Sequence, residues 1–330
     1  MLVYECISGG GLSARDAGDA SLALPCTGLL AQGTAMRDAL VADLLDLEQL
    51  SVSCAAAWYA PLPATLAGAQ SLRADAYESA TDFLALRVHG YDRVWVIAPE
   101  SDGLLASLVA TVGHTRWVGC SPPAIRLAAS KSATRSRLAA YGISVPASWR
   151  PGETEPPDGS LWIVKPDDGA GCEATRLHAD FAQAREDLLG RIAQGLATTL
   201  ESWVDGIPLS LSLLCADGRA ELLSINRQRV TGRPGALLVY HGVDVGTVEL
   251  GSVEGRRLAR LAQEIAAAVP GLAGYVGVDL IWCQSGGPVV VEINPRLTCA
   301  YVGLSAALGR NLAGEILNAR HPEATPHAVH

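Results

Sequence analysis

Two acidic residues in the C-terminal part of the sequence have the spacing of a cation-binding pair. Asp279 and Glu292 lie in apolar segments that flank the turn-like stretch CQSGGP. If these segments form a simple antiparallel hairpin centred between Ser285 and Gly286, the two residues are cross-strand partners with Cβ atoms about 5 Å apart. Two carboxylates at that distance repel each other, and either a shared proton or a divalent cation relieves the repulsion.

A third oxygen donor follows in the same segment. Asn294 stands two residues beyond Glu292 and therefore points to the same face of its strand. Two carboxylates and an amide oxygen suit Mg²⁺, which keeps waters and takes substrate phosphates as further ligands, with Mn²⁺ as an alternative. The sequence therefore predicts a metal site at Asp279, Glu292 and Asn294. The competing interpretation is a solvated polar strand end.

Lysine is rare in this chain, which holds 25 Lys and Arg residues but only two lysines, Lys131 and Lys165. A lysine is a compact cation on a flexible stem and suits a phosphate oxygen. Lys165 ends an apolar run and is followed by a loop at residues 167–171, whose glycines let backbone N–H groups approach phosphates. With the metal trio, this pattern predicts a nucleotide site with Lys131 as a second phosphate lysine. The alternative for Lys131 is a solvated helix residue.

The segments that carry these residues alternate between strand-like and helix-like patterns. Short apolar runs predict strands, and longer Ala/Leu-rich segments at helical spacing predict helices between them. This alternation predicts an α/β (α+β) protein whose first domain, residues 1–118, contains an open and mostly parallel sheet. The strands expected around the candidate chemistry are residues 2–7, 93–100, 161–165, 199–204, 208–215, 220–226, 274–282 and 287–294.

Composition narrows the class of protein. The 330 residues are 49% hydrophobic and 18% charged, which indicates a globular protein of two or three domains. The net charge of −9 disfavours nucleic acid and anionic membranes as partners. Eight cysteines without a CxxC pair indicate reduced thiols, and no signal peptide or membrane-spanning run is visible, so we expect a cytoplasmic protein.

The order of these motifs resembles that of the ATP-grasp superfamily of carboxylate–amine ligases. Lys131 is followed by KPDDGAG, LESWVDG, VGVDLIW and VVVEINPRL, and the EINPR element is the most specific of them. The resemblance covers roughly the last two thirds of the chain. It implies an ATP-grasp fold after an N-terminal Rossmann-like (pre-ATP-grasp) substrate domain. It also implies a small subdomain at residues 119–200 that holds the lysines, and a large subdomain at residues 201–320 that holds the metal.

Roles for individual residues follow from this resemblance. It implies that Asp279, Glu292 and Asn294 hold magnesium, and that Arg296 faces the acyl phosphate or the acid substrate. Gly206 is followed by Ile207 where many relatives have a carboxylate that holds the ribose, so the ribose contact stays open. The residues implied to bind ATP, through phosphates, glycine loop and adenine hinge, are Lys131, Lys165, Asp168, Gly169, Gly171, Glu201, Trp203 and Val204.

A narrower resemblance spans the whole chain. The stretches YECISGGGL, VIAPESD, VGCSPPAI and GYVGVDLIW are similar to those of the tyramine–glutamate ligases of methanofuran biosynthesis and their bacterial relatives. This resemblance implies a γ-glutamyl amide product, with tyramine or a related amine such as tyrosine as acceptor. The expected partners are therefore a small-molecule acid and a small-molecule amine. A homodimer is among the oligomeric states that the sequence leaves open.

Other polar residues have two interpretations. Arg227 and Arg229 point to one face of a strand, opposite Gln228, and Arg227 joins Arg296 as a catalytic candidate that could clamp a carboxylate or a phosphoryl group. Glu100 and Asp102 follow a strand end, where they either bind substrate or form an ordinary turn. The alternative functions are an ATP-grasp phosphotransferase, an ATP-grasp ligase with another acid and amine, and a non-catalytic nucleotide-binding regulatory protein.

Overall fold

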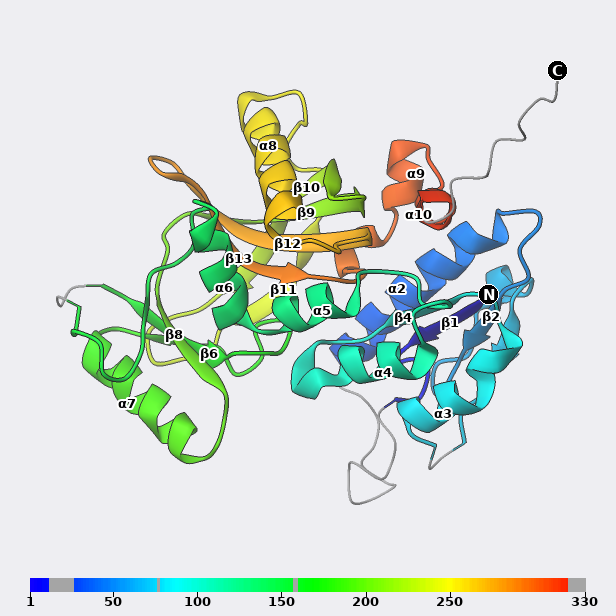
Figure 1. Ribbon diagram of the computed structural model, residues 1–330, viewed down its shortest axis with the longest axis horizontal. Coiled ribbons are helices and arrows are strands. Elements are labelled where there is room, and N and C mark those ends of the chain that lie inside the picture. The colour runs from blue at the N-terminus through cyan, green and yellow to red at the C-terminus, as the bar shows by residue number, and fades with distance from the viewer. Residues whose placement is uncertain (12–26, 76–77, 157–159, 320–330) are drawn as a thin grey trace. The chain divides into compact units, whose positions relative to one another are not determined.

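The computed structural model describes residues 1–11, 27–75, 78–156 and 160–319 (Figure 1). The chain divides into two compact units. The first unit comprises Met1–Ile97, Thr111–Gly119 and Tyr301–His330, and the second comprises Ala98–Ala110 and Cys120–Ala300. Among the described residues, no helix combines the length and the apolar character needed to cross a membrane.

The first unit is built on a four-stranded parallel sheet, as the alternation of strands and helices predicts. Its strand order is β3-β2-β1-β4, and both central strands are buried along their whole length. Buried runs such as LVYE and VWVI are typical of parallel strands that are covered on both faces. The elements are β1 (Leu2–Glu5), α2 (Thr27–Leu45), β2 (Ser53–Ala55), η1 (Ala64–Leu66), β3 (Gln70–Leu72), α3 (Ala80–Arg87), η2 (Val88–Gly90), β4 (Val94–Ile97), α9 (Leu304–Leu308) and α10 (Leu312–Ala319).

Glu5 closes the turn that follows β1. Its carboxylate accepts hydrogen bonds from the Ser8 amide at 2.7 Å and the Ser8 hydroxyl at 2.6 Å. Burial raises the pKa of Glu5, although the hydrogen bonds from Ser8 oppose this shift. A Cβ at Gly33 of α2 would lie 2.6 Å from the Glu5 carboxylate, so a glycine is needed where the helix passes this side chain.

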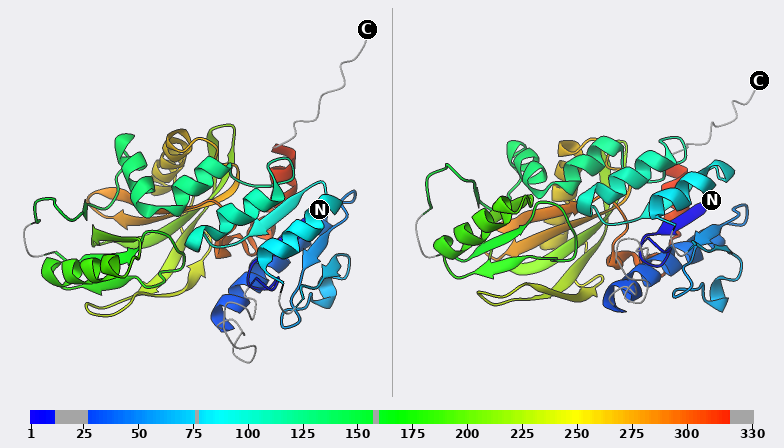
Figure 2. Two further views of the ribbon diagram at one scale, coloured as in Figure 1. Left: turned by 60° about the horizontal axis from the view of Figure 1, so that its bottom comes forward. Right: turned by 90° about the horizontal axis from the view of Figure 1, so that it is seen from below.

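The second unit contains two sheets. The larger one is antiparallel, with strand order β11-β10-β9-β12-β13, and α5, α6 and α8 pack on it (Figure 2). The smaller one has strand order β5-β8-β6-β7, and α7 packs on it around Trp162 and Phe181. The remaining elements are η3 (Ser101–Gly103), α4 (Leu104–Val112), α5 (Pro122–Ala129), α6 (Lys131–Ala140), β5 (Ser148–Trp149), β6 (Trp162–Pro166), β7 (Arg176–His178), α7 (Phe181–Ala193), β8 (Thr198–Ser202), β9 (Ile207–Ala216), β10 (Arg219–Thr231), β11 (Val239–Asp244), α8 (Val253–Ala268), β12 (Gly274–Cys283), β13 (Gly287–Asn294) and η4 (Cys299–Tyr301).

The β12–β13 hairpin differs from the simple hairpin that the sequence suggests. Cys283 pairs with Gly287, so the turn is centred on Ser285 rather than between Ser285 and Gly286. The register then shifts between Asp279 and Leu280, because one extra residue of β13 forms a bulge. Beyond that bulge Asp279 does face Glu292. The predicted pairing is therefore present, and two offsets that cancel produce it.

Asp187 of α7 gives a pH-dependent test of the smaller sheet. Its carboxylate accepts bonds from Arg191 at 2.8 Å and contacts His178 at 2.9 Å. Burial alone would raise the pKa of Asp187, but the bonds from Arg191 and His178 outweigh burial and lower it. The ionised group therefore stabilises the fold above the pKa of the unfolded chain, and this stability is lost as the pH falls through the lowered folded pKa.

We expect Asp187→Asn to lower the Tm by about 2–4 °C at pH 7, because a partly exposed network of this kind contributes about 1 kcal/mol. The difference from the wild type should shrink as thermal unfolding is repeated at decreasing pH towards pH 3. Asp82→Asn is a suitable control, since Asp82 makes its hydrogen bond with Ser79 at the exposed start of α3. A Tm difference that does not change with pH would contradict the assigned role of the Asp187 charge.

Candidate active site

The acidic pair lies at the centre of the candidate site. Asp279 of β12 and Glu292 of β13 are cross-strand partners, and Asn294 Nδ2 lies 3.3 Å from Asp279 Oδ2. Burial and the neighbouring Glu292 raise the pKa of Asp279 well above its ordinary value. Burial acts on Glu292 in the same direction, but Lys131 and Lys165 outweigh it and hold the pKa of Glu292 below its usual range. A divalent cation would relieve the repulsion between these two partly buried carboxylates.

The two carboxylates and the Asn294 amide fit the predicted Mg²⁺ only if the amide oxygen also serves as a ligand. Within the described parts of the chain, no three His, Cys, Asp or Glu side chains gather in a group that could hold a metal ion. A third protein oxygen beside the two carboxylates would therefore have to come from Asn294, whose side-chain amide already contacts Asp279. A set of three oxygens with few protein ligands matches Mg²⁺ bound together with nucleotide phosphates.

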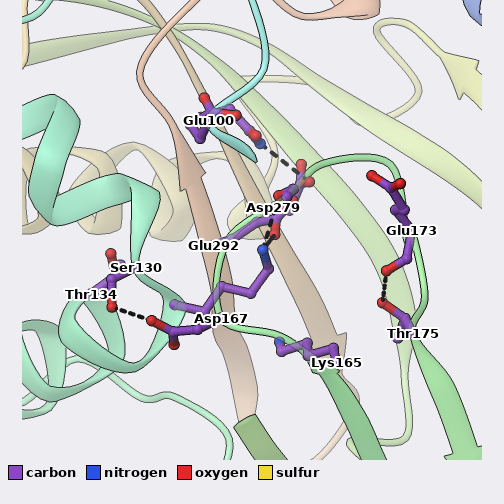
Figure 3. Close-up of polar contacts among 12 residues, drawn as sticks. Glu100, Ser130, Thr134, Lys165, Asp167, Glu173, Thr175, Asp279 and Glu292 are labelled. Carbon is purple, nitrogen blue, oxygen red and sulfur yellow. Dashed lines mark hydrogen bonds and ion pairs between the residues drawn. The ribbon is translucent and has the colours of Figure 1, made fainter. Parts of the chain in front are cut away.

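Both lysines lie buried beside this pair. Lys131 is the first residue of α6, and its Nζ lies 2.9 Å from the Gly169 carbonyl oxygen and 3.5 Å from Glu292 Oε2. Lys165 belongs to β6 and lies near Asp279 and Glu292 (Figure 3). Its Nζ lies 2.7 Å from Glu201 Oε2 of β8. The structure thus brings together the two lysines and the acidic pair, with Glu292 in contact with the first lysine.

The glycine loop has the backbone conformation that the sequence suggests. Gly169 and Gly171 have φ angles of 99° and 66°, in the left-handed region that favours glycine. The Asp168 carboxylate accepts the Asp102 amide at 2.7 Å. Cys172 ends the loop, and burial together with Glu292 raises the pKa of its thiol to about 12. The thiol is therefore neutral at physiological pH and is a poor nucleophile.

The two arginine candidates lie in different environments. Arg296 is largely but not fully buried, and its Nε and Nη2 each lie 3.0 Å from one carboxylate oxygen of Glu100. Burial would lower the pKa of Arg296, but the Glu100 carboxylate outweighs burial and raises it. Arg227 is exposed and shares its cross-strand row with Leu209, whereas Asp279 pairs with Ser210. The structure therefore does not bring Arg227 together with the acidic pair.

Comparison with protein families matches a pre ATP-grasp 3 domain to residues 50–125 and an ATP-grasp domain to residues 128–300. The ATP-grasp match alone covers just over half of the chain. The chain belongs to the ATP-grasp family. This finding, with the two-unit structure, confirms the predicted ATP-grasp fold with a preceding domain. The comparison with curated proteins finds no matching sequence.

Solved structures share the ATP-grasp architecture. An ATP-grasp superfamily protein from Archaeoglobus fulgidus is 21% identical, with a TM-score of 0.68 over 96% of this chain and 87% of that chain. An L-amino acid ligase from Bacillus licheniformis is 17% identical, with a TM-score of 0.65 over 87% of this chain and 72% of that chain. A D-alanine–D-alanine ligase from Bacillus anthracis complexed with ATP is 16% identical, with a TM-score of 0.62 over 96% and 95%. At these identities the likeness shows the fold alone.

The segment expected to form the adenine hinge leads from β8 of the smaller sheet to β9 of the larger sheet. Glu201 is buried, and its carboxylate lies 2.7 Å from Lys165 Nζ. The Trp203 indole donates to Asp205 at 2.7 Å, and Val204 lies between them. Gly206 passes the next strand so closely that a Cβ would lie 2.5 Å from the Trp282 carbonyl oxygen. The close approach explains the glycine in the LESWVDG motif.

Sequence reasoning missed one side chain on the site face of β10. Gln228 hydrogen-bonds with Asp279 and lowers its pKa against the larger effects of burial and Glu292. It lies on the face opposite Arg227, as strand alternation requires. The sequence signal was present, because Gln228 continues the polar alternation that begins at Ser224 and Asn226.

A buried polar ladder beside the acidic pair was also missed. Asn226 is fully buried and donates to Ser212 Oγ at 3.1 Å, while its own oxygen accepts the Ser224 hydroxyl at 2.7 Å. Ser212 Oγ contacts the Tyr275 hydroxyl at 2.8 Å. Polar residues at every second position of an otherwise apolar strand, as in SLSLL, are the signal that could have revealed this ladder. Because its groups are paired, the ladder holds three strands in one register below the carboxylates.

Proposed function

We propose that this ATP-grasp protein is an ADP-forming ligase that joins a carboxylate to an amine through an acyl phosphate. The observation that supports the proposal most directly is the contact of Lys131 with Glu292 at 3.5 Å, because a lysine beside two carboxylates suits a site for magnesium and nucleotide phosphates. Amide formation needs such a site, because a carboxylate must be activated before an amine can displace its oxygen. Charge neutralisation and positioning supply most of the catalysis in phosphoryl transfer.

In this proposal the chain positions the reactants and compensates charge. Lys131 and Lys165 bind phosphate oxygens of ATP, and the hinge around Glu201 binds the base. Asp279, Glu292 and Asn294 would hold Mg²⁺, which when bound supplies positive charge against the phosphates. A carboxylate oxygen of the acid attacks the γ-phosphorus and ADP leaves. The amine then attacks the carbonyl carbon, and inorganic phosphate and the amine proton leave.

Arg296 is the residue proposed to hold the acid or its acyl phosphate. Its guanidinium binds the Glu100 carboxylate through Nε and Nη2, and this two-point pairing supports the proposal because acyl phosphates and carboxylates are recognised in the same way. For the substrates we propose glutamate as the acid and tyramine or a related amine, as in methanofuran-type cofactor biosynthesis. The whole-chain resemblance of YECISGGGL and VIAPESD to tyramine–glutamate ligases supports this choice.

Arg296→Lys should lower kcat by roughly two orders of magnitude, because a lysine cannot make the two-point contact. Arg310→Lys is the matched control, since Arg310 pairs with Glu315 in a half-exposed ion pair of the first unit, whereas Arg296 belongs to the second unit. Steady-state ADP release gives both rates. An Arg296→Lys enzyme with wild-type kcat and KM would remove Arg296 from the mechanism.

The test of the function itself is ADP release from purified protein with MgATP and glutamate, with and without a panel of amines. The proposed ligase requires both acid and amine and yields a product of their summed mass less water. Release with acid alone would instead favour the alternative of an ATP-grasp phosphotransferase. Tight ATP binding without turnover across a broad panel of acids and amines would favour a regulatory nucleotide-binding protein.

A further inference from the structure

Asp167 connects the segments that carry the two lysines, because it follows Lys165 by two residues and is hydrogen-bonded to the backbone of Lys131. It is the first residue after β6, and its backbone N–H donates to the Ala197 carbonyl at 2.9 Å. Its own carbonyl accepts the backbone N–H of Lys131 at 2.8 Å. One residue of the glycine loop is thereby bonded both to the smaller sheet and to the start of α6.

The Asp167 carboxylate makes a second connection to the same helix. Oδ2 accepts the Ser130 hydroxyl at 2.6 Å, and Oδ1 accepts the Ser132 backbone N–H at 2.8 Å (Figure 3). The Ser130 hydroxyl also accepts the Ala133 amide at 3.1 Å as the N-cap of α6. Residues on both sides of Lys131 are therefore held by one side chain.

The hydrogen bonds from Ser130 and Ser132 to Asp167 limit how an anion can bind at the N-terminus of α6. A helix N-terminus is a ready anion site, because its first N–H groups lack partners within the helix. Here the Asp167 carboxylate already occupies that position. A nucleotide phosphate is thus left to the Lys131 ammonium, which extends to the Gly169 carbonyl at 2.9 Å, rather than to the helix end.

We propose that Asp167 is a positioning residue that fixes the first turn of α6 against the glycine loop and so sets where Lys131 meets the nucleotide phosphates. This inference rests on the proposed nucleotide function and adds a residue that does not touch the nucleotide. An acidic side chain next to phosphates is electrostatically unfavourable for binding them, so its contribution comes through geometry. Removing only the charge and removing the whole side chain therefore have different effects.

The first experiment compares MgADP affinity by calorimetry in two variants. Asp167→Ala removes both side-chain bonds and should raise the Kd for MgADP roughly tenfold or more. Asp167→Asn keeps an oxygen for the Ser132 amide and offers an N–H to Ser130, so its Kd should stay within about threefold of the wild type. Asp180→Ala is the matched control, because Asp180 caps α7 through the Gln183 amide at 2.9 Å. It should lose thermal stability without losing affinity.

A second experiment asks whether Asp167 acts through Lys131. If it does, Asp167→Ala should weaken MgADP binding little further in a Lys131→Met background, so the two effects are strongly non-additive. Additive losses would overturn the positioning role. If Asp167→Ala does not fold, Ser130→Ala against Ser252→Ala decides, since both serines cap helices but only Ser130 donates to Asp167.

The outcomes separate this inference from the proposed function. A wild-type protein that does not bind MgADP overturns the proposed function and this inference together. A wild-type protein that binds MgADP, with an Asp167→Ala variant of equal affinity, overturns the inference alone. Equal affinities of the Ser130→Ala and Ser252→Ala variants have the same meaning.

Discussion

Glu292→Gln should reduce kcat for ADP release by about a thousandfold or more, while the protein stays folded. Glu292 connects the acidic pair with the first of the two lysines. It faces Asp279 across the β12–β13 ladder, and its Oε2 lies 3.5 Å from Lys131 Nζ. Glutamine keeps the size of the side chain but loses the charge that a divalent cation and the lysine both need. Steady-state ADP release and a thermal melt measure the two quantities.

Two further variants sharpen this prediction. Asp279→Asn should lose less activity, because the amide leaves a neutral oxygen in the same place. Glu221→Gln is the control, since Glu221 lies at an exposed position of β10 in the same sheet. Wild-type turnover in Glu292→Gln would show that the metal assignment is wrong. If Asp279→Asn were less active than Glu292→Gln, Asp279 rather than Glu292 would be the more important of the two proposed metal ligands.

The acidic pair shows how far local sequence patterns reach. Strand alternation and a short turn predict that Asp279 and Glu292 face each other, and the register confirms the pairing, although the turn lies half a residue earlier than predicted and a bulge compensates for this difference. The bulge between them could not be predicted, because a bulge depends on packing of the whole sheet rather than on a residue type. The parallel sheet of the first unit was also predictable from a local pattern. Short, continuously apolar runs such as VWVI are typical of parallel strands that are buried on both faces.

Side-chain pairings between segments that are distant in the chain could not be predicted from the sequence. Glu201 was assigned to the hinge for its backbone, yet its carboxylate pairs with Lys165 across β8 and β6. Arg296 was expected to face substrate, and nothing local indicated that Glu100 binds its guanidinium. Arg227 and Arg229 are a conspicuous charged pair in the sequence. The neutral residue between them, Gln228, is the one that hydrogen-bonds with Asp279. A sequence shows which residues are charged, but it does not show which face of the sheet lines the site.

Lys165→Met should weaken MgADP binding roughly tenfold to a hundredfold and also destabilise the protein by about 3–5 kcal/mol. The two effects have different causes. The loss of affinity comes from the missing cation at the phosphates. The loss of stability comes from Glu201, which is 3% exposed and would be left as a buried charge without its partner at 2.7 Å. Calorimetric titration with MgADP and urea unfolding measure them separately.

A double variant separates these causes. Lys165→Met with Glu201→Gln removes the stranded charge, so most of the lost stability should return while nucleotide affinity stays low. Recovery of affinity along with stability would mean that Lys165 serves only as the partner of Glu201. Lys165→Arg is the charge-conserving comparison. Its wider planar group should keep much of the ion pair and bind phosphate less well, because the site between β6 and β8 fits a compact ammonium group. Unchanged affinity in Lys165→Arg would show that charge alone, rather than the shape of lysine, is required at this position.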